Sequence, residues 1–274
     1  MKKILFTFTT VLMILFMSAC DKTTSSGDTG RMVIKVTDDP FDISGVESAT
    51  VTITKVEIRK TGDCIPDGNP FLLLSDDTVT LNLIDLRNGV TSTLLDLEIP
   101  EGKYDLIRLY VDEAGLKLKD VDDPYSVKVP GGNHTGIKVF IDPAITVAGG
   151  LSSEVLLDFD LAKSFVLRGN MTNNNGFIFK PCIRAANLTT TGRIAGMVTD
   201  TSDIKIADAS VWVMIDTVMA TTFSDTTGHY ALIGLQAGTY SVFATKEGYD
   251  TVGYEGINVI EGNRTLQDFA LTKK

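Results

Sequence analysis

Histidine, cysteine and tryptophan are scarce in this 274-residue chain, and the scarcity of histidine and cysteine limits its chemistry. The two histidines, His134 and His229, lie near neither a cysteine nor each other in the sequence. The sequence contains no Gly-x-Ser-x-Gly elbow, glycine-rich phosphate loop or His-Glu-x-x-His motif. We therefore expect no enzymatic activity and no cofactor, and we interpret His229 as a surface turn residue.

The chain also lacks an apolar run long enough to span a bilayer. Residues 4–17, which follow Lys2 and Lys3, have about two-thirds of the roughly 20 residues that a spanning helix needs. This segment is typical of a signal peptide. The tract Met17-Ser18-Ala19-Cys20 that closes it resembles a bacterial lipoprotein lipobox. The resemblance implies cleavage before Cys20 and a diacylglycerol on its sulfur, so that the lipid on Cys20 would attach the protein to a membrane.

An ordinary cleaved signal peptide with an accidental cysteine is the alternative. If Cys20 carries lipid, only Cys64 and Cys182 are left of the three cysteines to pair with each other. A disulfide between them and two separate thiols both stay open, because a sequence does not give the distance between two sulfur atoms.

Positive charge is in deficit as well. The net charge is −10, and removal of Lys2 and Lys3 with the signal peptide would make it −12. Such a surface repels phosphate backbones and anionic lipid headgroups. We expect no nucleic-acid binding, and any membrane attachment has to come from the lipid.

Short runs of Val, Ile, Leu and Thr, separated by Gly, Pro, Asp and Asn, are abundant and predict β-strands. The fold class is therefore all-β, with two antiparallel β-sandwich domains in tandem. The predicted segments are a signal peptide (1–19), a flexible tether (20–30), a first domain (31–188), a linker (189–192) and a second domain (193–274). A parity change between Ile53 and Val56 predicts a β-bulge near Thr54 and Lys55. Because the linker is short, the two domains are expected to touch.

The second domain carries several motifs in a fixed order. They are Gly196-Met197-Val198-Thr199-Asp200, Ala209-Ser210-Val211-Trp212-Val213, Asp225-Thr226-Thr227-Gly228-His229-Tyr230 and Leu235-Gln236-Ala237-Gly238-Thr239-Tyr240. This block resembles the carboxypeptidase regulatory-like family, a small transthyretin-like sandwich. We expect Asp225 and Gly228 to form a tight turn, and the hydroxyls of Tyr230 and Tyr240 to reach backbone atoms. The resemblance implies architecture rather than catalysis.

The first domain carries different motifs. They are Val33-Ile34-Lys35-Val36-Thr37-Asp38-Asp39-Pro40, Gly102-Lys103-Tyr104-Asp105-Leu106-Ile107-Arg108-Leu109, Val129-Pro130-Gly131-Gly132 and Leu157-Asp158-Phe159-Asp160. This block resembles a domain of unknown function found in Bacteroidetes-type lipoproteins. The resemblance implies an outer-membrane lipoprotein.

Two groups of carboxylates and one indole are candidate binding residues. Calcium favours clustered oxygen ligands such as those of Asp38, Asp39 and Asp42, or of Asp120, Asp122 and Asp123. Solvated turns explain both groups equally well, so no metal site is predicted. Trp212 lies between Val211 and Val213 on a predicted strand and therefore faces away from them. It could stack on a glycan, or pack against the first domain or under a loop.

The function predicted from these patterns is a membrane-anchored cell-envelope lipoprotein with a non-enzymatic binding or scaffold role. One alternative is a carbohydrate-binding accessory lipoprotein that uses Trp212. A second is a component of a surface fibre or adhesion assembly. The expected partners are the membrane, through Cys20, and a glycan or an envelope protein.

Overall fold

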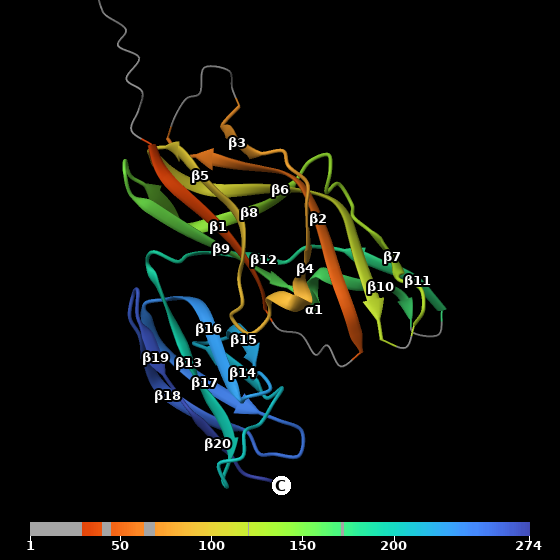
Figure 1. The fold of residues 1–274 in the computed structure, drawn as a ribbon, viewed down its shortest axis with the longest axis vertical. Coiled ribbons are helices and arrows are strands. Elements are labelled where there is room, and N and C mark those ends of the chain that lie inside the picture. Colours follow the sequence, from red (N-terminus) through yellow and green to blue (C-terminus); the bar gives the residue numbers. More distant parts are fainter. Residues whose placement is uncertain (1–28, 40–44, 63–68, 120, 171–172) are drawn as a thin grey trace, which may run out of the picture.

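The computed structural model describes residues 29–39, 45–62, 69–119, 121–170 and 173–274. Cys20 and Cys64 lie outside these residues, as do Asp42 and Asp120. Buried side chains form two hydrophobic cores, one between Met32 and Phe179 and the other between Ile194 and Leu271. The predicted all-β class and the tandem arrangement are confirmed (Figure 1).

The first domain contains β1 (Thr29–Asp39), β2 (Val46–Lys60), β3 (Phe71–Ser75), β4 (Val79–Asn82), η1 (Leu83–Leu86), β5 (Ser92–Pro100), β6 (Gly102–Leu118), β7 (Tyr125–Lys128), β8 (Ile137–Val147), β9 (Ser152–Asp160), α1 (Leu161–Ser164), β10 (Phe165–Asn170), β11 (Asn173–Phe179) and β12 (Ile183–Asn187). The second domain contains β13 (Thr191–Asp200), β14 (Ser210–Met214), β15 (Val218–Phe223), β16 (His229–Gln236), β17 (Gly238–Thr245), β18 (Val252–Val259), β19 (Arg264–Leu266) and β20 (Phe269–Leu271). Within the described ranges, no helix is long and apolar enough to cross a membrane.

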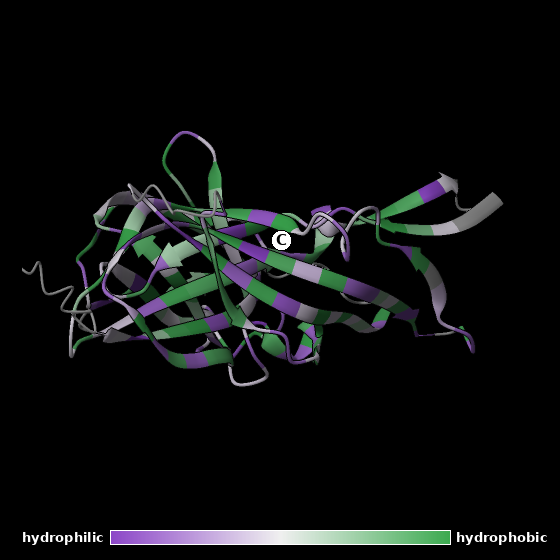
Figure 2. Ribbon diagram, turned by 90° about the horizontal axis from the view of Figure 1, so that it is seen from above, coloured by the Kyte–Doolittle hydropathy of each residue, from purple (hydrophilic) through white to green (hydrophobic). Residues whose placement is uncertain are grey.

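In the first domain, the long strands β2 and β6 pair over nearly their whole length. β8 pairs with β6 on one side and with β12 on the other, which joins this ribbon to the β5-β1-β9-β12 layer. Hydrophobic and hydrophilic residues alternate along these strands (Figure 2), so one face of each layer supplies the core. The register shifts between Ile53 and Lys55, which confirms the predicted bulge.

Parallel pairs are the main topological feature that the sequence pattern did not indicate. β1 runs parallel to β9, and β7 runs parallel to β11. The hydrophobic alternation of a strand shows which face is buried, but it does not identify a partner strand more than a hundred residues away.

In the second domain, a β16-β13-β19 sheet faces a β15-β14-β17-β18 sheet. Val211 and Val213 are fully buried between them. The predicted turn is confirmed, because Gly228 has a φ of 81° and the Asp225 carboxylate accepts hydrogen bonds from the backbone of Thr227 and His229. The backbone N–H of Val198 on β13 donates to the carbonyl of Gly228, so the turn is also tied to the neighbouring strand.

The two domains touch, as the short linker predicted. Arg184 on β12 donates a hydrogen bond of 2.9 Å to the carbonyl of Gly234 on β16. Asn88 in the first domain donates to the carbonyl of His229, and Gln236 donates to the carbonyl of Asp142. The contact lies against β15 and β16, the edge strands of the two small sheets (Figure 1), so it covers edges that could otherwise pair with another chain.

Candidate functional site

A pocket whose described lining residues all have apolar side chains or none lies at one end of the first domain, in a cavity of about 250 Å³. It is formed where the first residues of β2 meet the last residues of β6, beside η1, α1 and the β10–β11 hairpin. The lining residues, which define the apolar pocket, are Gly45, Val46, Ala49, Ile84, Leu116, Leu118, Leu161, Ala162, Phe165 and Phe177.

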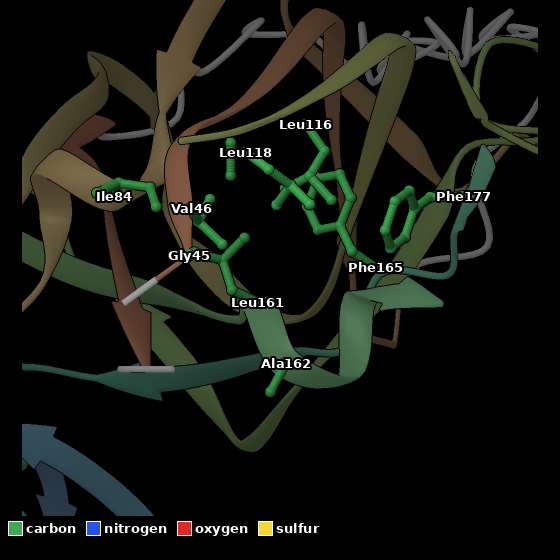
Figure 3. Close-up of a pocket in the computed structure, with 10 residues that line it drawn as sticks. Gly45, Val46, Ile84, Leu116, Leu118, Leu161, Ala162, Phe165 and Phe177 are labelled. Carbon is green, nitrogen blue, oxygen red and sulfur yellow. The ribbon is translucent and has the colours of Figure 1, made fainter. Parts of the chain in front are cut away.

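Figure 3 shows how these side chains lie. Those of Val46, Leu116 and Phe165 are directed toward a common space, whereas the methyl group of Ala162 points away from it. Val46 and Leu116 are almost fully buried, while Phe165 is half-buried. The walls of the pocket are therefore part of the folded core, and only its mouth reaches the surface.

The short helix α1 closes one side of the pocket, and its ends are held by hydrogen bonds. The Asp160 side chain caps the helix by accepting from the backbone N–H of Lys163 at 2.9 Å. The Ser164 hydroxyl accepts from the backbone N–H of Cys182 at 2.9 Å. These bonds fix the direction in which Leu161 enters the pocket.

Aromatic contacts fix the opposite side. Phe165 and Phe179 are cross-strand neighbours with ring centroids 5.1 Å apart. Phe177 packs its ring against Tyr125 in an edge-to-face contact with centroids 5.3 Å apart. Paired rings on neighbouring strands hold one another in place. The two phenylalanines of the pocket are thus positioned before any ligand arrives.

The described lining of the apolar pocket offers burial of apolar surface to a ligand. Among the described residues that line it, none has a titratable side chain or one that can donate a hydrogen bond. General acid or base catalysis needs such a group within reach of the substrate. A dry cavity with apolar walls instead binds apolar molecules, because they lose contact with water when they enter it.

A polar cluster of the first domain lies elsewhere, on the side of β2 and β6 that faces away from the core. Glu57 accepts hydrogen bonds from Lys55 at 2.9 Å and from the Tyr110 hydroxyl at 3.0 Å, and Arg108 lies 3.3 Å from it. Burial acts to raise the pKa of Glu57, but the bonds from Lys55 and Tyr110 outweigh it and lower that pKa. A carboxylate held ionised in this way is poorly suited to proton transfer near neutral pH.

A buried ion pair lies behind the interdomain contact. The Asp158 carboxylate on β9 accepts a hydrogen bond of 2.7 Å from Arg184, the residue that also binds Gly234. Burial raises the pKa of Asp158 above its ordinary value, and the guanidinium of Arg184 offsets this only in part. Arg184 therefore compensates a buried charge and links the two domains at once.

Trp212 lies on the outer face of the β15-β14-β17-β18 sheet, opposite to Val211 and Val213 as predicted. It is half-buried, and its ring stacks on that of Phe243. Phe223 shares this outer face, because it lies opposite Ser210 in the register. Tyr254 lies on the inner side, opposite Val242, with its ring against Phe269.

The remaining predicted site residues are dispersed. Cys182 is exposed, and its pairing with Cys64 stays a prediction because Cys64 lies outside the described residues. Both histidines are exposed. Within the described ranges, no three His, Cys, Asp or Glu side chains gather in a way that could hold a metal ion. Asp38 is buried, whereas Asp122 and Asp123 are exposed in a loop.

The sequence did not reveal the apolar pocket. Its residues come from six elements spread between Gly45 and Phe177, and each looks like an ordinary core position in its own segment. Phe243 was missed for a similar reason, because its contact with Trp212 depends on the pairing of β14 with β17. The alternation around Phe243 could have placed it on an outer face.

Comparison with known proteins agrees with the two-part organisation. Residues 29–181, over half of the chain, match a family described as a domain of unknown function (DUF4382). Residues 193–272 match the carboxypeptidase regulatory-like domain. Among curated proteins, none matches the chain significantly.

Several solved structures resemble the chain weakly. The Bacillus anthracis TIE protein is 13% identical with a TM-score of 0.26, and the match covers 90% of this chain but only 34% of that one. The shaft pilin SpaA of Lactobacillus rhamnosus GG is 12% identical with a TM-score of 0.28, over 90% of this chain and 98% of that one. The minor pilin GBS52 of Streptococcus agalactiae is 11% identical with a TM-score of 0.25, over 89% and 96%.

None of these three structures superposes closely on the whole chain at such TM-scores. The family matches are specific, and the residues they cover coincide with the two hydrophobic cores. The chain belongs to the DUF4382 family and carries a carboxypeptidase regulatory-like domain at its C-terminal end.

Proposed function

We propose that this chain is a lipid-anchored protein of the cell envelope whose first domain binds an aliphatic chain in the apolar pocket, without catalysing a reaction on it. The observation that carries the proposal is the pocket itself, about 250 Å³ lined by apolar side chains and open to solvent on one side. Each methylene group that such a site buries stabilises a complex by roughly 0.8 kcal/mol. A short aliphatic segment is therefore the ligand that these walls favour.

The anchor is the second part of the proposal and depends on the sequence. Cys20 follows a signal-like apolar segment and precedes a polar stretch, residues 21–28, that would separate the folded domains from the bilayer. Two or three acyl chains on one residue hold a protein on a membrane firmly. The outer membrane is the proposed location.

Metabolic labelling with an alkyne-tagged palmitate tests the anchor. We expect the wild-type chain to incorporate the label and to enter the detergent phase, and the Cys20→Ala chain to lose both properties. Cys182→Ala, which changes an exposed cysteine of the folded part, is the matched control and should stay labelled. Labelled, membrane-bound Cys20→Ala protein would contradict this part of the proposal.

Binding of the fluorescent fatty acid cis-parinarate tests the pocket. Leu118 is half-buried in the pocket wall, so Leu118→Trp should fill the cavity and weaken binding about tenfold or more. Leu95 is also half-buried and packs on the same core without lining the pocket, so Leu95→Trp is the matched control. Equal loss of affinity in both variants would show that the probe binds elsewhere.

A further inference from the structure

The second domain has an outer sheet face whose central residues are uncharged. The alternation of β14, β15, β17 and β18 and their register place hydroxyl and apolar residues on this side. The residues that define the aromatic face are Ser210, Trp212, Met214, Thr221, Phe223, Ser241, Phe243, Thr245 and Gly253. The nine residues of the aromatic face include no Asp, Glu, Lys or Arg, although the chain has a net charge of −10. Glu255 borders the face next to Ser241, where the register of β17 and β18 shifts.

Trp212 and Phe243 form the centre of this face. They are directly opposite each other on β14 and β17, with ring centroids 5.5 Å apart and planes inclined by 16°. Phe243 extends over Gly253, its partner on β18, because a Cβ there would overlap the ring carbons Cδ1 and Cε1. The glycine thus leaves room for the Phe243 ring, and the Phe243 ring supports the indole of Trp212.

We infer that the aromatic face binds a neutral carbohydrate. The C–H groups on one face of a pyranose ring carry partial positive charge and pack against the negative face of an aromatic ring. Both rings are half-buried, so part of each is exposed to a ligand. Ser241, Thr245 and Ser210 beside them carry hydroxyl groups, which can donate to or accept from sugar hydroxyls.

The absence of charge on the face separates this ligand class from others that stack on aromatic rings. A nucleotide would bring phosphate groups, and the aromatic face has no lysine or arginine to neutralise them. An acidic glycan would likewise find no lysine or arginine on the aromatic face to pair with its carboxylate or sulfate groups. The site is independent of the apolar pocket, which lies in the first domain, so either proposal can fail without the other.

The inference can be tested on the full mature chain with an array of neutral glycans. The oligosaccharide that binds best is then used for calorimetry. We expect Trp212→Ala to weaken binding about tenfold or more and Trp212→Phe to weaken it less. Tyr254→Ala is the matched control, since this partly exposed aromatic of the same domain lies on the other side of β18. It should bind like the wild type.

The melting temperature of each variant shows whether the domain is still folded, and Trp212→Phe keeps the test decisive if Trp212→Ala unfolds. The inference would be overturned if the wild-type chain bound no glycan on the array. It would also be overturned if a folded Trp212→Ala chain bound the glycan as tightly as the wild type. Self-association of the wild type that Trp212→Ala abolishes, with no glycan bound, would overturn it in favour of contact between two copies of this chain.

Discussion

At the scale of single residues, Arg184 contributes both to an ion pair with a buried carboxylate and to the contact between the domains. Its side chain joins Asp158, which is only 9% exposed, to the carbonyl of Gly234 in the other domain. A buried charge that loses its partner is much more costly than an exposed one. Arg31 and Asp96 form a pair of the same chemistry on the surface, with side chains 54% and 41% exposed.

Arg184→Ala should therefore lower the free energy of unfolding by about 3 kcal/mol, because it leaves the Asp158 carboxyl buried without its cation. Arg31→Ala should change stability very little, since water replaces the lost guanidinium. Urea unfolding of both variants checks this. Equal effects on the free energy of unfolding would contradict the assignment of Arg184 as the partner of a buried carboxylate.

The raised pKa of Asp158 gives stability a dependence on pH. A carboxyl with a higher pKa in the folded state stabilises that state when protonated. This contribution is complete below the ordinary pKa of 3.8 and is lost as pH rises through the raised value. The wild type should lose stability relative to Asp158→Asn over this interval. Urea unfolding of both proteins from pH 3.5 upward measures the difference in their free energies of unfolding. If this difference does not change with pH, the pKa of Asp158 is not raised.

At the scale of elements, both domains use the same device at the start of a long strand. The Tyr104 hydroxyl donates to the carbonyl of Pro100 at 2.7 Å, and the Tyr240 hydroxyl donates to the carbonyl of Gln236 at 2.8 Å. Each tyrosine lies four residues after its acceptor and two after a glycine. The bond ties the strand to the turn before it, as in the tyrosine corners of other β-sandwiches.

Removing one such bond tests its contribution. Tyr240→Phe keeps the ring in the core but leaves the Gln236 carbonyl without its donor, so we expect a loss of about 1 kcal/mol. Tyr254→Phe is the control, because that side chain is 42% exposed and water can solvate its hydroxyl. Thermal unfolding of both variants distinguishes them, and an unchanged Tyr240→Phe protein would contradict the role of the corner.

Much of this element structure could be predicted from the sequence because it depends on local pattern. The alternation of apolar residues indicated the strands, the parity change predicted the bulge at Thr54, and the Tyr230 and Tyr240 hydroxyls reach backbone carbonyls as expected. Segment 83–97 changes from η1 to most of β5 within 15 residues, so no single period describes it. Strand partners and the apolar pocket depend on distant segments, so no local signal specified them.

At the scale of the whole molecule, we expect the interdomain contact to make the two sandwiches unfold as one cooperative unit. Gly234 has a φ of 68°, and a Cβ at this position would lie 3.0 Å from the Cβ of Ala186 in the first domain. The backbone of β16 can approach β12 this closely only with a glycine there. A side chain at this position would therefore disturb the contact between the domains.

Gly234→Val should separate the domains and convert a single calorimetric unfolding transition into two, because it adds a clash across the contact to the backbone strain. Gly248→Val is the matched control. Gly248 has a φ of 83° but nothing within 4 Å of the added Cβ, so it introduces strain without the clash. Two transitions in the control, or one in Gly234→Val, would contradict this account of the contact.

The central claim is that the first domain binds an aliphatic chain. Methyl NMR of a protein that lacks residues 1–19, titrated with dodecanoate, tests it most directly. We predict that the methyl signals of Val46, Ile84, Leu116, Leu118 and Leu161 shift together and saturate, because these side chains line the apolar pocket. Methyl groups of the second core, such as those of Leu232 and Val242, should stay unchanged. No shift at the pocket residues, or equal shifts in both domains, would contradict the claim.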